Sequence, residues 1–180
     1  MSFSISSIKS AINRLRGVDR STQFEVEIHP PLGTDSSIVE DLKFFVSNAS
    51  IPSIGLQSTE LMHHGYGVLE KRPNAIIFED AQLTILSDGN GEVLDFLRKW
   101  LQYIYSFGPR GPDRFSYPDE YVGTVTIRKF KADGTPNYTY TLHRAYPLTM
   151  GSVPLDWAAV NEVIRVPVNF AFYSWTFDKA

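Results

Sequence analysis

The sequence predicts a mainly β (α+β) fold: an antiparallel β-barrel or sandwich with one flanking α-helix and a short N-terminal helix. Apolar and polar side chains alternate over several short segments, and Gly, Pro or Asp turns separate these segments. Aromatic residues make up 13% of the chain, which suits sheets because flat and branched side chains pack well on a pleated surface. Only one long segment, residues 91–106, has helical periodicity instead.

The composition indicates a folded protein without thiol chemistry. A length of 180 residues without a linker or repeat predicts a single domain spanning residues 1–180. The absence of cysteine excludes disulfides and cysteine-ligated metals. We expect no membrane anchor, because no apolar run approaches the roughly 20 residues of a spanning helix. The net charge of −3 argues against specific nucleic-acid binding, which needs clustered Lys and Arg.

The N-terminal half begins with a predicted arm, residues 1–20. Residues 4–16 carry an apolar stripe at helical spacing and predict a short amphipathic helix; the stripe consists of Ile5, Ile8, Ile12 and Leu15. Residues 23–29 alternate between apolar and acidic side chains and predict a half-buried strand. A second strand is expected over residues 43–49, and Pro52 ends it because proline cannot donate to a strand ladder.

No periodicity is sustained over residues 57–73, which therefore predict a long loop around Gly65-Tyr66-Gly67. A loop of this length is uncommon in a compact domain and is usually functional. Residues 75–78 and 82–86 then predict further strands.

The predicted helix over residues 91–106 follows the turn Asp88-Gly-Asn-Gly91. Its apolar stripe consists of Val93, Leu94, Leu97, Trp100, Leu101 and Ile104. Residues 108–120 are rich in Gly, Pro and Asp and predict a loop. Residues 121–131 and 137–146 predict a hairpin around the turn dipeptide Asp133-Gly134.

The C-terminal residues 164–177 predict one unusually long alternating strand. Its apolar face holds Val166, Val168, Phe170 and Phe172, and the intervening positions are Arg165, Pro167, Asn169, Ala171 and Tyr173. Long open strands invite pairing, so they are typical of barrels or of sheets that a neighbouring subunit completes. This strand predicts a protein that assembles rather than catalyses.

The chain lacks a specific catalytic signature, so we expect neither an enzyme nor a cofactor. In Asp88-Gly-Asn-Gly91, the third glycine of a dinucleotide-binding fingerprint would fall at Leu94, so a strand-to-helix turn is the better interpretation. The histidines His29, His63, His64 and His143 do not have the spacing of a helical zinc pair. Two carboxylate pairs, Glu79-Asp80 and Asp119-Glu120, are interpreted as solvated charge at element ends.

The order of these segments resembles the tail tube proteins of contractile-tailed bacteriophages, within the superfamily that also includes type VI secretion tubes. The resemblance covers roughly residues 20 to 177. The residues that carry it are Phe24-Glu-Val-Glu-Ile28, Phe78-Glu-Asp-Ala-Gln-Leu-Thr-Ile85, Phe96-Leu-Arg-Lys-Trp100, Tyr121-Val-Gly-Thr-Val-Thr-Ile127, Ala145-Tyr-Pro-Leu148, Leu155-Asp-Trp157 and Phe172-Tyr-Ser-Trp175.

This resemblance implies a virion protein, assembled in the host cytoplasm, whose homohexameric rings stack into the inner tube of the tail. Implied partners are the tail sheath, baseplate tube-initiating proteins, the tail terminator, and a tape-measure protein and transiting DNA in the lumen, without specific binding. The loop 57–73 would reach the adjacent ring, and the N-terminal arm would pack against a neighbour. The expected inter-ring contacts are Leu61, His64, Gly65, Tyr66 and Gly67. The expected inter-subunit sheet residues are Arg165, Asn169, Ala171 and Tyr173.

Two alternatives remain open at this stage. The chain could be the tube protein of a related contractile injection or type VI secretion system, with the same fold and other partners. A different class is a carbohydrate-binding β-sandwich that uses Tyr66, Trp157 or Trp175, because aromatic rings can stack on sugars.

Overall fold

A computed structural model describes residues 19–31, 38–62, 67–106, 114–157 and 162–180, together with Lys9 and Arg14. Its helices are α2 (Val39–Phe45), α3 (Glu92–Ile104) and α4 (Pro118–Tyr121). Its strands are β1 (Phe24–His29), β2 (Val46–Ala49), β3 (Ile54–Leu61), β4 (Glu70–Phe78), β5 (Ala81–Leu86), β6 (Tyr105–Ser106), β7 (Arg114–Phe115), β8 (Gly123–Phe130), β9 (Pro136–Met150), β10 (Arg165–Ala171) and β11 (Ser174–Lys179).

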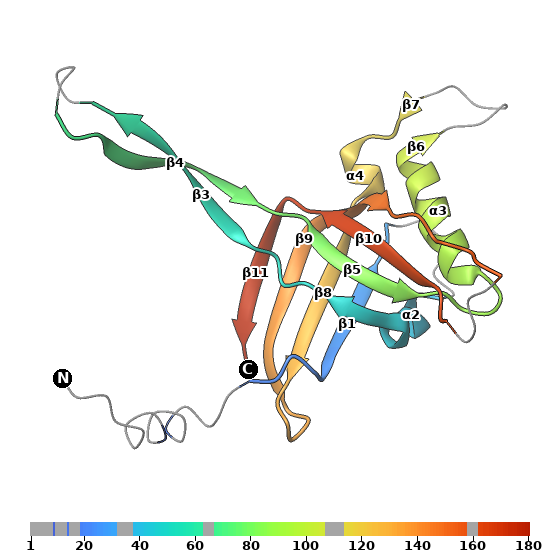
Figure 1. Cartoon of the computed structure of the whole chain (residues 1–180). Coiled ribbons are helices and arrows are strands. Elements are labelled where there is room, and N and C mark those ends of the chain that lie inside the picture. The colour runs from blue at the N-terminus through green and yellow to red at the C-terminus, as the bar shows by residue number, and fades with distance from the viewer. Residues whose placement is uncertain are drawn as a thin grey trace.

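Two antiparallel sheets share strand β9 (Figure 1). The first sheet has the order β1-β8-β9-β11, and the second has the order β9-β10-β5-β2. Among the described strands, β1, β2 and β11 each pair with a single neighbour, so the sheets form a sandwich-like arrangement without closing into a barrel. The predicted fold class is confirmed in this form.

Strand β9 changes sheets at a β-bulge. Residues 136–145 pair with β8, and residues 146–150 pair with β10. At the junction, Arg144 is the extra residue opposite the Gly123/Thr124 step, with a left-handed φ of 54°. A bulge bends the strand and increases its twist, which turns β9 out of the first sheet and into the second.

Several predicted elements are confirmed, including the strands over residues 75–78 and 82–86, which belong to β4 and β5. Strand β1 buries Val26 and Ile28 and leaves its acidic residues outside. Helix α3 begins after Gly91, and its first turn is capped by Asp88, whose carboxylate accepts hydrogen bonds from the backbone N–H groups of Glu92 and Val93. The β8–β9 hairpin turns at Gly134, which has a φ of 80°.

The strand predicted over residues 43–49 is wrong in its first half, because Lys43 to Phe45 end helix α2. Apolar residues at Ile38, Leu42 and Phe45 follow helical spacing, and Leu42 is fully buried. Only residues 46–49 form the strand, β2, which pairs with β5.

The long loop predicted over residues 57–73 is mostly a β-hairpin. Strands β3 and β4 pair from Ile54↔Phe78 out to Leu61↔Glu70 and form a sheet of their own. Periodicity is hidden here because both faces of the hairpin are exposed, so no core selects alternating apolar residues.

The single C-terminal strand predicted over residues 164–177 is two strands. Strand β10 lies in the second sheet between β9 and β5, and β11 lies at the edge of the first sheet beside β9. The chain crosses between the sheets at Phe172 and Tyr173, and the Tyr173 N–H donates to the carbonyl of His143 (3.1 Å).

Two further predictions fall partly outside the described residues. In the N-terminal arm, Lys9 and Arg14 are helical, whereas the apolar stripe of residues 4–16 lies outside the described part. In the predicted loop 108–120, residues 114–115 form β7 and residues 118–120 belong to α4. No helix in the described ranges is long and apolar enough to cross a membrane.

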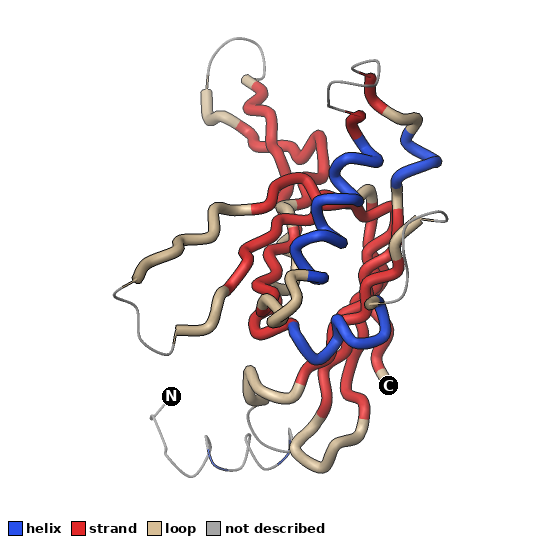
Figure 2. Tube along the Cα trace, turned by 90° about the vertical axis from the view of Figure 1, so that its right-hand side faces the viewer, coloured by secondary structure: helices blue, strands red, loops and turns tan. Residues whose placement is uncertain are grey.

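The core centres on Trp100 of α3, which flanks the sandwich (Figure 2). The fully buried indole ring packs edge-on against Phe170 of β10, with centroids 5.9 Å apart, and its N–H donates to the carbonyl of Tyr121 (2.9 Å). Gly123 lets the ring approach β8 and β1, since a Cβ there would lie 3.1 Å from the ring and 2.3 Å from the His29 carbonyl oxygen. Trp100 therefore joins the helix to both sheets.

We expect Trp100→Ala to lower the free energy of unfolding by about 3–5 kcal/mol, because it leaves a cavity and an unpaired carbonyl. Urea unfolding of the monomeric chain measures this. Arg98→Ala, an exposed position on the same helix, is the control and should change stability by less than about 0.5 kcal/mol. Equal stability of the Trp100 variant and the control would refute the central role of the indole.

Candidate assembly surface

The largest group of exposed apolar side chains among the described residues lies on the β3–β4 hairpin, which we call the arm. The arm projects away from the sandwich (Figure 1). Eight residues of extended strand span about 25 Å, so its outer end lies well clear of the body. An isolated two-stranded hairpin is marginally stable in water, which indicates that the arm is completed by contacts with another molecule.

The arm is fixed to the body at its base. Ser53 donates from its hydroxyl to a carboxylate oxygen of Glu79 (2.7 Å), which joins the two ends of the hairpin. The ring of Phe78 packs against that of Phe172, with centroids 5.8 Å apart, where the chain crosses from β10 to β11. These contacts orient the arm without covering its outer residues.

One face of the arm near its base is apolar. The register pairs Ile54 with Phe78 and Leu56 with Ile76, and alternation places these four side chains on the same face. Ile54, Leu56 and Ile76 are 57%, 65% and 60% exposed. Contiguous exposed aliphatic side chains on a folded protein mark an interaction surface.

The outer half of the arm is polar beyond a bulge and apolar again at its outer end. An extra residue, Asn74, interrupts the register between the Gln57↔Ala75 and Ser58↔Pro73 pairs, and its amide donates to the Thr59 hydroxyl (2.7 Å). Beyond this bulge, Lys71 lies 3.5 Å from a carboxylate oxygen of Glu60. Apolar side chains return at the outer end, where Val68 is 92% exposed.

The predicted inter-ring residues belong to this outer end. Leu61 is the last residue of β3 and is exposed, and Gly67 has a φ of 105°, which favours glycine. His64, Gly65 and Tyr66 lie outside the described residues. Their assignment to a contact between rings stays a proposal.

The predicted inter-subunit sheet residues lie on and after β10, which is an inner strand. Its backbone pairs with β5 and β9, and its outward positions are occupied by Arg165, Asn169 and Ala171; Tyr173 is exposed in the crossover to β11. These four residues can therefore contact a neighbour through side chains. Backbone pairing with another copy is open instead to edge strands such as β11 and β1.

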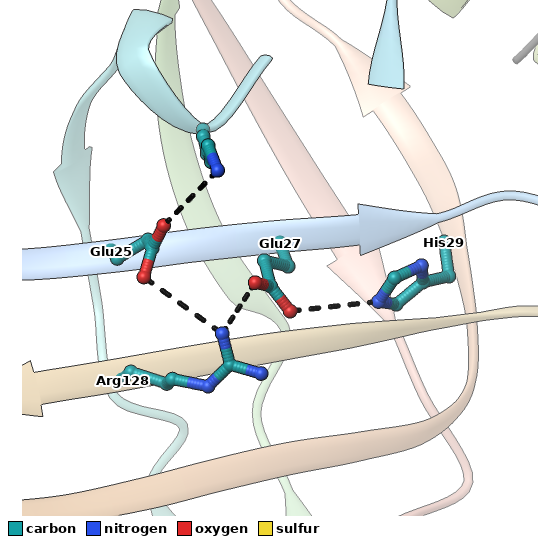
Figure 3. Close-up of polar contacts among 5 residues, drawn as sticks. Glu25, Glu27, His29 and Arg128 are labelled. Atoms are coloured by element: carbon teal, nitrogen blue, oxygen red, sulfur yellow. Dashed lines mark hydrogen bonds and ion pairs between the residues drawn. The ribbon is translucent and has the colours of Figure 1, made fainter. Parts of the chain in front are cut away.

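The outer face of the first sheet is polar. The register places hydroxyl groups from β8, β9 and β11 on it, together with the charged network of Figure 3. Arg128 pairs with Glu27 and lies 3.8 Å from Glu25; Glu27 also lies 3.7 Å from His29, and Lys43 of α2 lies 3.8 Å from Glu25. The hydrogen bond from Arg128 is the largest influence on Glu27 and lowers the pKa of its carboxyl group.

A second apolar projection is the connection from β9 to β10. Its base is held by a hydrogen bond from the Gly151 N–H to the Pro167 carbonyl (2.7 Å), and further along Leu155 is exposed and Trp157 is 106% exposed. By contrast, Trp175 packs against Tyr140, and its indole N–H is buried without a partner. Of the three aromatic residues considered for sugar binding, Tyr66 lies outside the described residues.

Chemistry-bearing side chains in the described part of the chain do not converge on a metal site. Within the described ranges, no group of three potential His, Cys, Asp or Glu ligands lies together. A shallow hollow of about 560 Å³ is lined by His29, His143 and Arg144, among others, and Asp119 there is held by Arg144 at 2.7 Å. The Asp88 carboxylate, next to the glycines of the turn, caps α3, as described above.

Comparison with known proteins decides the family. Residues 19–178 match the sequence profile of a family described as "Phage tail tube protein". The chain belongs to this family. A curated relative, the "Tail tube protein" of Serratia phage KSP90, is 22% identical over 177 residues, covering 98% of each chain. Membership gives the chain a structural role in a phage tail tube, as the resemblance in sequence predicted.

Solved structures share the fold. A chain of the anti-feeding prophage baseplate has a TM-score of 0.64 at 14% identity, covering 91% of this chain and 97% of that one. A chain of the sheath–tube complex of an extracellular contractile injection system, in its extended state, has a TM-score of 0.60 at 17% identity, covering 99% and 100%. An Hcp protein gives 0.53 at 9% identity, covering 87% and 90%.

The sequence directs the inter-ring prediction to residues 57–73, which include the outer part of the arm, but it does not predict an exposed apolar face at the base of the arm. Ile54, Leu56, Ile76 and Phe78 do alternate with other residues over short stretches, and this was the available signal. Prolines at positions 52 and 73 and Gly55 obscured the signal, because they are typical of turns. The base of the arm therefore had to be found from the structure.

We expect the Glu27–Arg128 pair to make stability depend on pH. Because the folded-state pKa of Glu27 lies below its ordinary value of 4.5, its contribution is present above that value and is lost as pH falls through the folded-state pKa. The urea midpoint should therefore fall more between about pH 5 and about pH 3 in the wild type than in Glu27→Gln. Asp178→Asn, two strands away from Arg128 in the same sheet, is the control and should keep the wild-type slope. Identical slopes for all three proteins would contradict the assignment.

Proposed function

We propose that the chain forms homohexameric rings that stack into the inner tube of a contractile phage tail, through which the genome passes during ejection. The observation that carries this proposal is the arm: a projecting hairpin with aliphatic side chains exposed on a chain of the tail tube family. Copies joined by a head-to-tail contact form a closed ring when the rotation from one copy to the next returns to the first copy. A second contact, along the axis of the ring, then stacks further rings.

Edge strands supply the second element of assembly. Strand β11 at one edge of the first sheet and β1 at the other each carry one described partner, so copies side by side can continue the sheet around a ring. In this arrangement the four predicted sheet residues contribute side-chain contacts beside the joint: Arg165, Asn169, Ala171 and Tyr173. Leu61, His64, Gly65, Tyr66 and Gly67 contact the adjacent ring.

The polar face of the first sheet suits the wall of a water-filled channel. It carries hydroxyl groups and paired charges, and its cation Arg128 is engaged by Glu25 and Glu27. Tight binding of DNA requires cations that are free to neutralise phosphates. A lumen lined by this face lets a polyanion pass without holding it.

The partners follow from the same assembly. We assign to this chain a surrounding tail sheath, baseplate tube-initiating proteins, a tail terminator, and a tape-measure protein in the lumen, with assembly in the host cytoplasm. The similar structures come from a baseplate and a sheath–tube complex, which supports these partner classes. The family match and the curated relative both name phage tail tubes, which favours a phage tail over an injection system.

Negative-stain electron microscopy of the purified protein over a range of concentrations tests the proposal. We expect hollow tubes or six-fold rings with a central channel. Dispersed particles of 20.4 kDa at every concentration, without rings, would contradict it.

Shortening the arm tests its part in assembly. Replacing residues 60–71 by Asn-Gly closes the hairpin with a two-residue turn at the Thr59↔Arg72 pair. We expect an unchanged melting temperature, since the removed residues lie outside the core, but loss of long tubes. Tubes of normal length from this variant would show that the outer arm does not connect rings.

A further inference from the structure

The arm carries two apolar patches with a charged band between them. The base patch consists of Ile54, Leu56 and Ile76, on one face near the body. The tip patch consists of Leu61, Met62, Val68 and Leu69, at the outer end. The band consists of Glu60, Glu70, Lys71 and Arg72. Two separate apolar surfaces on one hairpin raise the question whether they contact the same molecule.

The charges of the band satisfy one another. Lys71 lies 3.5 Å from a carboxylate oxygen of Glu60, and the Arg72 guanidinium donates twice to Glu70, at 3.1 Å each. All four side chains are also substantially solvated. Removing solvated ion pairs from water costs more than their attraction returns unless the partner supplies new hydrogen bonds. The band is therefore most stable at a hydrated position.

The base patch is continuous with the body. Phe78, on the same face, packs on Phe172. Edge strand β11 begins at Ser174, two residues after Phe172. A copy placed alongside the body, where it can extend the first sheet at β11, also lies against the base of the arm. The base patch thus belongs to the lateral surface of the subunit.

The tip patch lies beyond this lateral surface. Leu61 lies five positions beyond Leu56, which corresponds to about 17 Å of extended strand. A single neighbour covering both patches would have to bury the charged band between them. If two neighbours each cover one patch, the charged band lies at the hydrated seam between them.

We propose that the base patch binds the neighbouring copy in the same ring and that the tip patch binds a copy in the adjacent ring, with the charged band at the seam. This inference rests on the proposed function. It divides the contacts of the arm into a lateral contact within a ring and an axial contact between rings. Ring closure then buries the base patch first, and stacking buries the tip patch afterwards.

Three matched double variants separate the two steps. Leu56→Ser with Ile76→Ser removes the base patch, Met62→Ser with Val68→Ser removes the tip patch, and Glu60→Gln with Lys71→Gln neutralises an ion pair of the band as the control. All six positions are exposed and lie outside the core, so each variant should keep the wild-type melting temperature. Sedimentation velocity and electron microscopy then identify monomers, single rings and tubes.

We expect the base variant to remain monomeric, the tip variant to stop at single rings, and the control to form tubes. Amide hydrogen exchange gives a second readout: in single rings of the tip variant, residues 54–57 and 75–78 should be protected more than in the monomeric base variant. The inference is overturned if both patch variants stop at the same stage, if either forms normal tubes, or if the tip variant is monomeric. A wild-type chain that forms neither rings nor tubes would instead contradict the proposed function itself.

Discussion

The backbone hydrogen bonding of β9 to both sheets is the constraint on which the rest of the structure depends. Its first ten residues complete the first sheet between β8 and β11, and its last five begin the second sheet beside β10. The bulge at Arg144 sets the angle between these two parts. The buried faces that Trp100 joins, including Phe170 of β10 and the start of β8, are thereby brought together.

This arrangement separates stability from assembly. The body buries its core aliphatic residues within one cluster of sheets and helices that a single chain supplies. The arm and the edge strands have few such contacts within the chain, so in the proposed assembly their surfaces are buried only when copies meet. Exposed aliphatic residues on the arm are therefore consistent with a well-folded subunit whose interfaces are formed later.

The sequence predicted those parts of the fold that face a core on one side. Strand β1, helix α3 and the β8–β9 hairpin were placed correctly, because burial of one face imposes a period on the chain. The C-terminal strands were merged, although the sequence contains the signal: buried positions are even from Val166 to Phe170, and the aromatic positions beyond the crossover, Trp175 and Phe177, are odd. That shift of one residue marks the change of sheet. The arm had no such signal along most of its length, since neither face is buried in the monomer.

The sequence suggests a segment for the candidate surface but not the form of that surface. Residues 57–73 lack periodicity and predict a long loop, and the family resemblance implies that this loop contacts the adjacent ring. The division into two apolar patches required the register of β3 and β4, because pairing decides which side chains share a face. Likewise, the structure was needed to show that β10 is paired on both sides. Backbone pairing with a neighbour is therefore open only to edge strands elsewhere in the sheets.

The bulge at Asn74 and the neighbouring Pro73 also protect the free subunit from aggregation. Two exposed hairpins could otherwise stack edge to edge through their backbones and grow into a fibril. Pro73 has no N–H to donate, Asn74 interrupts the regular ladder, and the charges beyond them disfavour a second strand in register. The arm can therefore present aliphatic side chains to a docking surface while its own edges resist amyloid-like pairing.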